Sequence, residues 1–267
     1  MMINYNDTTV LVTGAASGIG RALATALGAR GAQVICADRD LPGAQETAAS
    51  IGNASQALEC DLSDPGAAAS LVEKSFTVSN RLDLVCSNAG IGLSGRVVDQ
   101  EITDSRDLAR LFEVNFYAAL KIAQTYSHLL DQSGQRGRLM VTASENSLSV
   151  PEAVNRGRMA FYGATKHALL VALEWMRIDH EGGALDLHVL MPGAVYTPMV
   201  SRLMPDPSKA PPELELIYPE RCAEVALKGL DHNLFYIPTQ AHLLDDMQPR
   251  MQEIKNSLEV MGIQKTY

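Results

Sequence analysis

The residues of this chain best suited to chemistry are Tyr162 and Lys166, which stand four positions apart. If this segment is helical, the two side chains lie one turn apart on the same face. An ammonium within a few ångströms of a phenol favours the phenolate, so we expect Lys166 to lower the pKa of Tyr162. Such a phenol suits general acid–base catalysis. The pair alone has a second interpretation, two polar residues on a solvated helix face, and the rest of the sequence must decide.

The first forty residues predict a strand, a glycine-rich turn, a helix and a second strand. Residues 9–12 are apolar and rich in β-branched side chains, as in a buried parallel strand. Residues 13–20 read TGAASGIG, and residues 21–30 form an alanine- and leucine-rich segment typical of a helix. Residues 33–37 are apolar again and end at Asp38. This order predicts the first part of a dinucleotide-binding fold.

The chemistry of that turn supports the same interpretation. Gly14, Gly18 and Gly20 let the backbone turn sharply and approach a pyrophosphate closely. The N-terminus of the helix that follows offers free N–H groups and a positive dipole end to the phosphates. Asp38 stands at the distance expected for an acid that accepts hydrogen bonds from the adenosine ribose hydroxyls. The alternative is a glycine turn of an ordinary α/β protein without a cofactor.

The spacing Gly-x-x-x-Gly-x-Gly, taken with Tyr162-x-x-x-Lys166, resembles the classical short-chain dehydrogenase/reductase family. The resemblance implies an α/β fold with one doubly wound Rossmann-type domain over residues 1–267, built on a parallel seven-stranded sheet flanked by helices. Four further motifs match in order between about residues 8 and 200. These are Cys60-Asp61-Leu62, Ser87-Asn88-Ala89-Gly90, Val114-Asn115-Phe116 and the turn from Pro192 to Thr197.

The resemblance implies four catalytic side chains. Tyr162 would exchange a proton with the substrate oxygen, and Lys166 would lower the pKa of Tyr162 and bind the nicotinamide ribose. Ser144, at the end of the predicted strand 137–143, would hold the substrate oxygen. Asn115 would support a water that links the lysine to solvent. Ser147 and Thr142 remain alternatives to Ser144.

The resemblance also implies which residues contact the cofactor, and Asp38 favours NAD over NADP because a carboxylate repels a 2′-phosphate. Arg39 complicates this preference, since a guanidinium can pair with that phosphate or stack on adenine. The expected cofactor-binding residues are Gly14, Ser17, Gly18, Ile19, Gly20, Asp38, Arg39, Asp61, Leu62, Asn88, Ala89, Gly90, Tyr162, Lys166, Pro192, Gly193, Val195 and Thr197.

Composition narrows the range of partners. The chain has 22 basic and 31 acidic residues, a net charge of −9, which argues against nucleic acid or an anionic membrane as the main partner. It contains no apolar stretch long enough to span a membrane, and its N-terminus lacks the pattern of a signal peptide. The four cysteines and six histidines show no metal-ligand spacing. We therefore expect a cytoplasmic protein that binds no metal.

The second half of the chain is where the substrate is expected. The interval between Ser144 and Tyr162 is longer than is usual in the family, and Arg156 and Arg158 in the loop 150–159 either meet an acidic substrate group or lie on a solvated surface. Residues 197–218 correspond to a mobile lid, and their methionines favour a hydrophobic or cyclic substrate. Residues 241–267 form a helical tail that we expect to be broken or kinked at Pro249.

These features predict an oxidoreductase that interconverts a secondary alcohol and a ketone with NAD(H), and that assembles as a dimer or tetramer through its long helices. A non-catalytic dinucleotide sensor or scaffold on the same fold is the first alternative. A sugar-nucleotide epimerase or dehydratase is the second, although the glycine spacing disfavours it.

Overall fold

A parallel seven-stranded sheet forms the centre of the protein, and its strand order is β3-β2-β1-β4-β5-β6-β7. The computed structural model describes residues 3–99, 105–151 and 157–264. Every pairing between neighbouring strands is parallel, which confirms the predicted doubly wound fold. The strands are β1 (Thr9–Thr13), β2 (Gln33–Asp38), β3 (Gln56–Glu59), β4 (Leu84–Ser87), β5 (Gly137–Thr142), β6 (Leu185–Met191) and β7 (Tyr236–Pro238).

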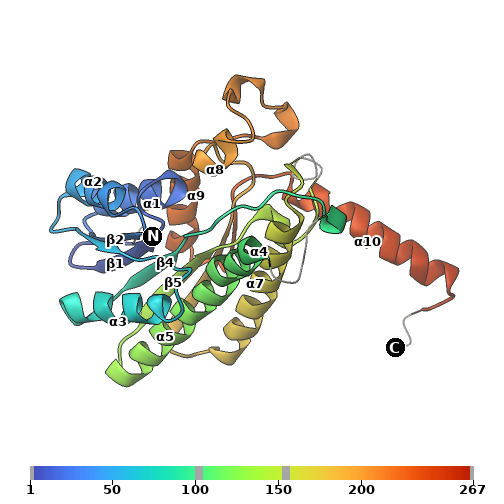
Figure 1. The fold of residues 1–267 in the computed structure, drawn as a ribbon. Helices are drawn as coiled ribbons and strands as arrows, with labels where there is room; N and C mark the ends of the chain where they lie inside the picture. Colours follow the sequence, from blue (N-terminus) through green and yellow to red (C-terminus); the bar gives the residue numbers. More distant parts are fainter. Residues whose placement is uncertain (1–2, 100–104, 152–156, 265–267) are drawn as a thin grey trace.

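Helices cover both faces of this sheet (Figure 1). The apolar residues of α1 (Gly18–Ala29), α2 (Leu41–Ile51) and α9 (Pro219–Asp231) belong to one buried cluster. Those of α3 (Ala67–Ser79), α5 (Ala118–Ser133) and α7 (Ala160–Asp179) belong to a second cluster. Successive residues of each inner strand point to opposite faces, so a strand such as β1 is buried along its whole length and feeds both clusters.

The strand order reverses between β1 and β4, and this point locates the site. In open parallel sheets, connections leave such a point toward opposite faces and open a crevice at the carboxyl ends of the strands. The glycine turn leaves β1 at this edge, and Asn88 follows β4 directly beside it. The fold therefore brings the predicted cofactor motif to the crevice.

Asn115 lies within a long helical stretch that has a local irregularity. It runs through α4 (Arg106–Phe112), a π-helical segment (Glu113–Tyr117) and α5. Asn115 is the middle residue of the π-helical segment. Single π-turns inside α-helices are uncommon and occur often at functional sites, and the sequence gives no indication of this one.

The C-terminal third carries short helices and then a long one that leaves the body of the protein (Figure 1). The segment after β6 contains α8 (Pro198–Ser201) and two 3₁₀ turns (Pro207–Lys209 and Pro212–Leu214) before α9. The last helix, α10 (Leu243–Val260), has Pro249 in its interior and continues through it. The predicted break at Pro249 is therefore wrong, and the alternative of a kink stays a prediction. No described helix is long and apolar enough to cross a membrane.

Candidate active site

The glycine turn packs so closely on its neighbours that side chains would not fit. Gly14 and Gly18 have φ angles of 71° and 52°, which L side chains rarely adopt. A Cβ built on Gly20 would lie 2.6 Å from the carbonyl carbon of Gly14 and 2.7 Å from Nδ2 of Asn88. The turn thus presents bare backbone at the start of α1, where Ser17 is the exposed N-cap residue and Ile19 lies in the first turn. This geometry suits a pyrophosphate.

Asp38 lies beside that turn, at the carboxyl end of β2. Its Oδ2 accepts a hydrogen bond from the backbone N–H of Ala16 at 3.0 Å, and its Oδ1 accepts one from Asp40 at 2.9 Å. These bonds fix the carboxylate between the glycine turn and the start of α2. Arg39 follows it and is exposed.

The residues predicted around the adenine are divided between surface and core. Asp61 accepts hydrogen bonds from the backbone and the hydroxyl of Ser63, which hold the pKa of its carboxyl below the usual range. Leu62 is buried in the core cluster beneath α3. Asp61 is therefore partly exposed just after β3, while the buried side chain of Leu62 anchors residues 60–62 to the core.

Asn88 and the residues after it join β4 to both neighbouring strands. The backbone N–H groups of Asn88 and Ala89 donate to the hydroxyl of Thr13 at 2.9 and 3.0 Å. Oδ1 of Asn88 accepts from the hydroxyl of Thr142 at 3.1 Å. Gly90 follows, and a Cβ there would lie 3.8 Å from Nζ of Lys166. The Asn-Ala-Gly segment therefore connects the glycine turn to Thr142 and Lys166.

Ser144 and Tyr162 are brought together at the carboxyl end of β5. The hydrogen bond from Ser144 lowers the pKa of Tyr162, although burial is the larger effect and raises it. The Ser144 hydroxyl also accepts from the backbone and side-chain N–H groups of Asn146, each at 3.2 Å. The alternatives are placed differently: the Thr142 hydroxyl donates to Asn88, and the Ser147 hydroxyl is buried with no partner among the described residues. The structure thus favours Ser144 as the residue beside the tyrosine.

The pKa of Tyr162 is raised in this structure, whereas the pairing with Lys166 predicted a lowered one. Burial raises the pKa of Tyr162 to about 12, and the nearby carboxylate of Glu145 adds to the increase. Nζ of Lys166 lies 5.8 Å from the centre of the tyrosine ring and donates to the Thr142 carbonyl at 2.7 Å. Burial also lowers the pKa of Lys166 to about 8. Desolvation is the largest effect on both pKa values, and Tyr162 keeps its proton at neutral pH.

Asn115 is buried and its amide is fully engaged. Its Oδ1 accepts from the backbone N–H of Ile91 at 2.9 Å, and its Nδ2 donates to the Ile91 carbonyl at 2.9 Å and to the Thr165 hydroxyl at 3.3 Å. The Thr165 hydroxyl donates in turn to the carbonyl of Tyr162 at 2.7 Å. Asn115 therefore ties the segment after β4 to the helix that carries Tyr162 and Lys166.

The turn after β6 closes the crevice from the side opposite to β2. Thr197 is the N-cap residue of α8, and a Cβ on Gly18 would lie 3.1 Å from its Cγ2. Pro192 and Val195 are buried, and Val195 pairs with Ile217 in an isolated bridge. Gly193 lies between Glu145 and Gln240, as described below. The turn from Pro192 to Thr197 thus reaches from Ser144 to the glycine turn.

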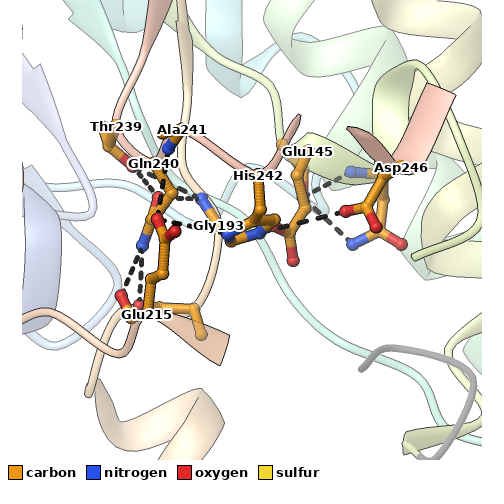
Figure 2. Close-up of polar contacts among 11 residues, drawn as sticks. Glu145, Gly193, Glu215, Thr239, Gln240, Ala241, His242 and Asp246 are labelled. Atoms are coloured by element: carbon orange, nitrogen blue, oxygen red, sulfur yellow. Dashed lines mark hydrogen bonds and ion pairs between the residues drawn. The ribbon is translucent and has the colours of Figure 1, made fainter. Parts of the chain in front are cut away.

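Five residues of this site were not predicted from the sequence to have a role in it. Thr13 and Thr165 hold backbone groups of the site through their hydroxyls. Gln240 binds the backbone of Gly193, and His242 binds Glu145, the residue after Ser144 (Figure 2). The one available signal was a glutamate directly after Ser144. Of the two loop arginines, Arg156 lies outside the described residues, and the Arg158 carbonyl accepts from the N–H of Gly95 at 2.7 Å.

Comparison with known proteins gives a consistent result. A family model described as "short chain dehydrogenase" matches residues 8–208. The 1-deoxy-11-beta-hydroxypentalenate dehydrogenase of Streptomyces avermitilis is 34% identical over 260 residues, which cover 96% of this chain and 92% of the relative. The versicolorin reductase stcU of Emericella nidulans is 34% identical over 203 residues, 73% of each chain.

Solved structures share the fold. A short-chain dehydrogenase/reductase from Burkholderia phymatum in complex with NAD aligns with a TM-score of 0.81 at 21% identity, covering 96% of this chain and 97% of that one. A short-chain dehydrogenase from Sphingobium yanoikuyae in complex with NADPH aligns with a TM-score of 0.76 at 24% identity, covering 97% and 96%. Proteins with this fold therefore bind either dinucleotide.

Proposed function

Because this chain belongs to the short-chain dehydrogenase family, we propose that it transfers hydride between NAD(H) and a secondary alcohol or ketone. The observation that carries the proposal is the meeting of Ser144, Tyr162, Lys166 and Asn115 at the carboxyl ends of the central strands, beside a bare glycine turn. A degenerate, non-catalytic member would be expected to lack part of this group. Oxidoreductase chemistry is the activity of the family, and the substrate and the preferred cofactor are the parts that we propose.

The residues of the crevice fit a dinucleotide. Gly14, Gly18 and Gly20 leave room for the pyrophosphate against the start of α1. Asp38 would receive the adenosine ribose, while Asp61 would lie against the adenine. The turn from Pro192 to Thr197 would hold the nicotinamide end near Tyr162 and Lys166. When bound, the nicotinamide ring supplies or accepts the hydride.

The protein's own groups would handle the proton. In the direction of reduction, the Tyr162 hydroxyl gives its proton to the substrate oxygen as negative charge develops there. The Ser144 hydroxyl, already within hydrogen-bonding reach of Tyr162, would hold that oxygen in place. Lys166 would stabilise the phenolate left behind, because its ammonium lies over the tyrosine ring. The attraction between the two groups becomes stronger once Tyr162 is negatively charged. Asn115 would hold α7, which carries both residues, in a fixed position relative to the segment after β4.

NAD is the proposed cofactor because of Asp38. Its carboxylate is fixed beside the glycine turn by the N–H groups of Ala16 and Asp40, so it cannot easily withdraw from a 2′-phosphate. The like charges would disfavour NADP. We expect kcat/KM to be at least about tenfold higher with NAD, and Asp38→Ser to reduce that preference. A wild-type preference for NADP would overturn the role given to Asp38.

A hydrophobic substrate is proposed from the side chains gathered near the catalytic group. A Cβ on Gly92 would lie 3.2 Å from Cε of Met159 and 3.4 Å from Cγ and Sδ of Met199. Leu203 joins this set, since a Cβ on Gly157 would lie 3.6 Å from its Cδ1. Met159 immediately precedes the helix of Tyr162, and Met199 and Leu203 belong to the segment 197–218, which we propose acts as a lid. The two relatives named for 1-deoxy-11-beta-hydroxypentalenate and versicolorin guide the choice of substrates to test.

The decisive experiment replaces Tyr162 by phenylalanine. Tyr162→Phe should bind NADH with the wild-type Kd and lower kcat by at least about a thousandfold, since only the transferable proton is removed. Wild type and variant are assayed with a panel of cyclic, steroid, aromatic and sugar alcohols and ketones by absorbance of the reduced nicotinamide. Exposed Tyr117→Phe is the matched control. Retained turnover in Tyr162→Phe would reject the mechanism, and an inactive wild type would support a dinucleotide sensor instead.

Assembly through the long helices forms part of the proposal. On α7, the side chains of Val171, Trp175 and Ile178 are 53%, 63% and 62% exposed and lie on one face. Such an apolar face on a helix of this length suits contact with a second copy. We expect a dimer or tetramer by light scattering, and Trp175→Glu should shift it toward the monomer. We place the protein in the cytoplasm, where its four free cysteines would stay reduced.

A further inference from the structure

The segment Thr239–His242, here called the C-terminal clamp, holds the turn that follows β6. Oε1 of Gln240 accepts from the backbone N–H of Gly193 at 2.8 Å, and Nε2 of Gln240 donates to the Ala194 carbonyl at 3.0 Å. A Cβ on Gly193 would lie 2.8 Å from Oε1 of Gln240 and 2.5 Å from Oε2 of Glu145. The backbone of Gly193 is therefore enclosed between the clamp and the residue that follows Ser144.

Within the clamp, His242 lies between carboxylates from three different elements (Figure 2). Its Nε2 is 2.9 Å from Oε2 of Glu145, which is buried in the 3₁₀ turn after Ser144. Its Nδ1 is 3.3 Å from Oε2 of Glu215, at the end of the segment 197–218. Asp246 on α10 lies 3.9 Å from Nε2. Within the described part of the chain, these three carboxylates are the charged groups that face the ring.

This arrangement fits a protonated imidazole. Nε2 hydrogen-bonds the Glu145 carboxylate, whereas Nδ1 lies within ion-pair distance of Glu215 but makes no hydrogen bond among the described residues. A positive charge on the ring would be attracted by both carboxylates. Although burial opposes the charge, the Glu145 and Glu215 carboxylates raise the pKa of His242 above its ordinary value. An imidazolium has no free lone pair for a cation, so the group Glu145, His242 and Asp246, whose ligand atoms lie within 4.8 Å of one another, is better described as an ion-pair cluster.

Glu145 connects the cluster to the catalytic residues. It directly follows Ser144, its backbone N–H donates to the Pro192 carbonyl at 2.9 Å, and its charge raises the pKa of Tyr162. A buried carboxylate without a cation is strongly unfavourable, so loss of the imidazolium would displace Glu145 or protonate it. Either change would move the backbone at Ser144 and at Pro192-Gly193 together.

We propose that His242 is a positioning residue, whose positive charge pairs with Glu145 and so holds Ser144 and the turn at Gly193 in place for catalysis. This inference rests on the function proposed above, because it assigns His242 to the support of that same site. His242 reaches the site from a position 97 residues along the chain from Glu145. The clamp would thus make the C-terminal segment part of the active centre.

The test is a double-mutant cycle on the pair. His242→Gln removes the cation and should lower kcat at least about tenfold, with the Kd for NADH changed less than about threefold, since the glycine turn and Asp38 lie outside the network. Glu145→Gln added to His242→Gln should restore most of the lost kcat, because it removes the unpaired charge. The matched control is His232→Gln, an exposed histidine just after α9. A His242→Gln enzyme with wild-type kcat, or a double variant no better than it, would overturn the proposal.

A second readout separates this inference from the function on which it rests. The imidazole protons of His242 are titrated by NMR in the wild-type protein, with the His242→Gln spectrum identifying the signal. The midpoint should lie above the ordinary value for histidine and fall in Glu145→Gln. A midpoint that is ordinary and insensitive to Glu145→Gln would refute the pairing. If the wild type turned over no substrate, the proposed function would fail, while this titration would still decide whether His242 pairs with Glu145.

Discussion

Replacing Lys166 by methionine should make the protein more stable while it removes activity. Methionine keeps most of the apolar stem and removes the ammonium of Lys166, a residue that is only 3% exposed. Burial lowers the pKa of Lys166 from 10.5 to about 8. Since a tenfold change in a protonation equilibrium corresponds to about 1.4 kcal/mol, keeping this ammonium buried costs about 3 kcal/mol at neutral pH.

The variant also loses one favourable contact. Nζ of Lys166 donates to the Thr142 carbonyl at 2.7 Å, and an unpaired buried carbonyl costs about 1–2 kcal/mol. The net gain in the free energy of unfolding at pH 7 is therefore about 1–2 kcal/mol. For a chain of this size, that corresponds to an increase in Tm of about 2–6 °C.

The pH dependence has a definite sign. Between pH 8 and 10.5 the unfolded wild type binds more protons at Lys166 than the folded protein does, so wild-type stability rises across this window. Lys166→Met lacks this increase. The extra stability of Lys166→Met over wild type should be present below pH 8 and shrink as the pH rises. Near pH 10.5 the variant should become the less stable protein, because only the lost contact with Thr142 still distinguishes the two.

Urea unfolding of wild type and Lys166→Met at pH 7 and pH 10, followed by far-UV circular dichroism, measures this difference. Other groups titrate equally in both proteins and cancel in the comparison. Lys228→Met, on the exposed side of α9, is the control and should differ little from wild type at either pH. A variant less stable than wild type at pH 7, or a difference that does not change with pH, would refute the reasoning.

Two further substitutions test the packing around the site. Gly20→Ala places a Cβ 2.6 Å from the carbonyl carbon of Gly14 and 2.7 Å from Nδ2 of Asn88, so the turn must move. Fluorescence titration should show that the Kd for NADH increases at least about tenfold. An unchanged Kd would contradict the geometry. Tyr126→Phe leaves the Leu82 carbonyl, which accepts from the Tyr126 hydroxyl at 2.6 Å, buried and unpaired; urea unfolding should show a loss of about 1–3 kcal/mol, whereas a neutral result would show that the carbonyl finds another partner.

The sheet and the cofactor crevice could be predicted from local patterns. Apolar runs such as β1 and β2, separated by a glycine turn and a helix, leave few arrangements other than parallel strands with the turn at their carboxyl ends. The glycines could be identified because the turn requires positive φ angles at Gly14 and Gly18 and a close backbone contact at Gly20. The π-helical segment at Asn115 could not, since no residue type specifies it and tertiary packing selects it.

The C-terminal half was harder to predict because its features also depend on tertiary contacts. Pro249 predicted an interruption, yet α10 continues through it, because the missing N–H removes one hydrogen bond from a helix that other turns still support. The contact between Glu145 and His242 joins residues far apart in sequence, and neither belongs to a repeating pattern. Only the path of the chain after β7 brings them together.

The sequence by itself determined which side chains are available for chemistry and at which edge of the sheet they gather, because strand order and spacing along the chain follow from local preferences. The tertiary structure decided how those side chains behave. Tyr162 keeps its proton and Lys166 holds its own less tightly, since the surrounding protein removes water from both. Desolvation depends on every group packed around a residue, so it could not be predicted from the spacing of Tyr162 and Lys166 in the sequence.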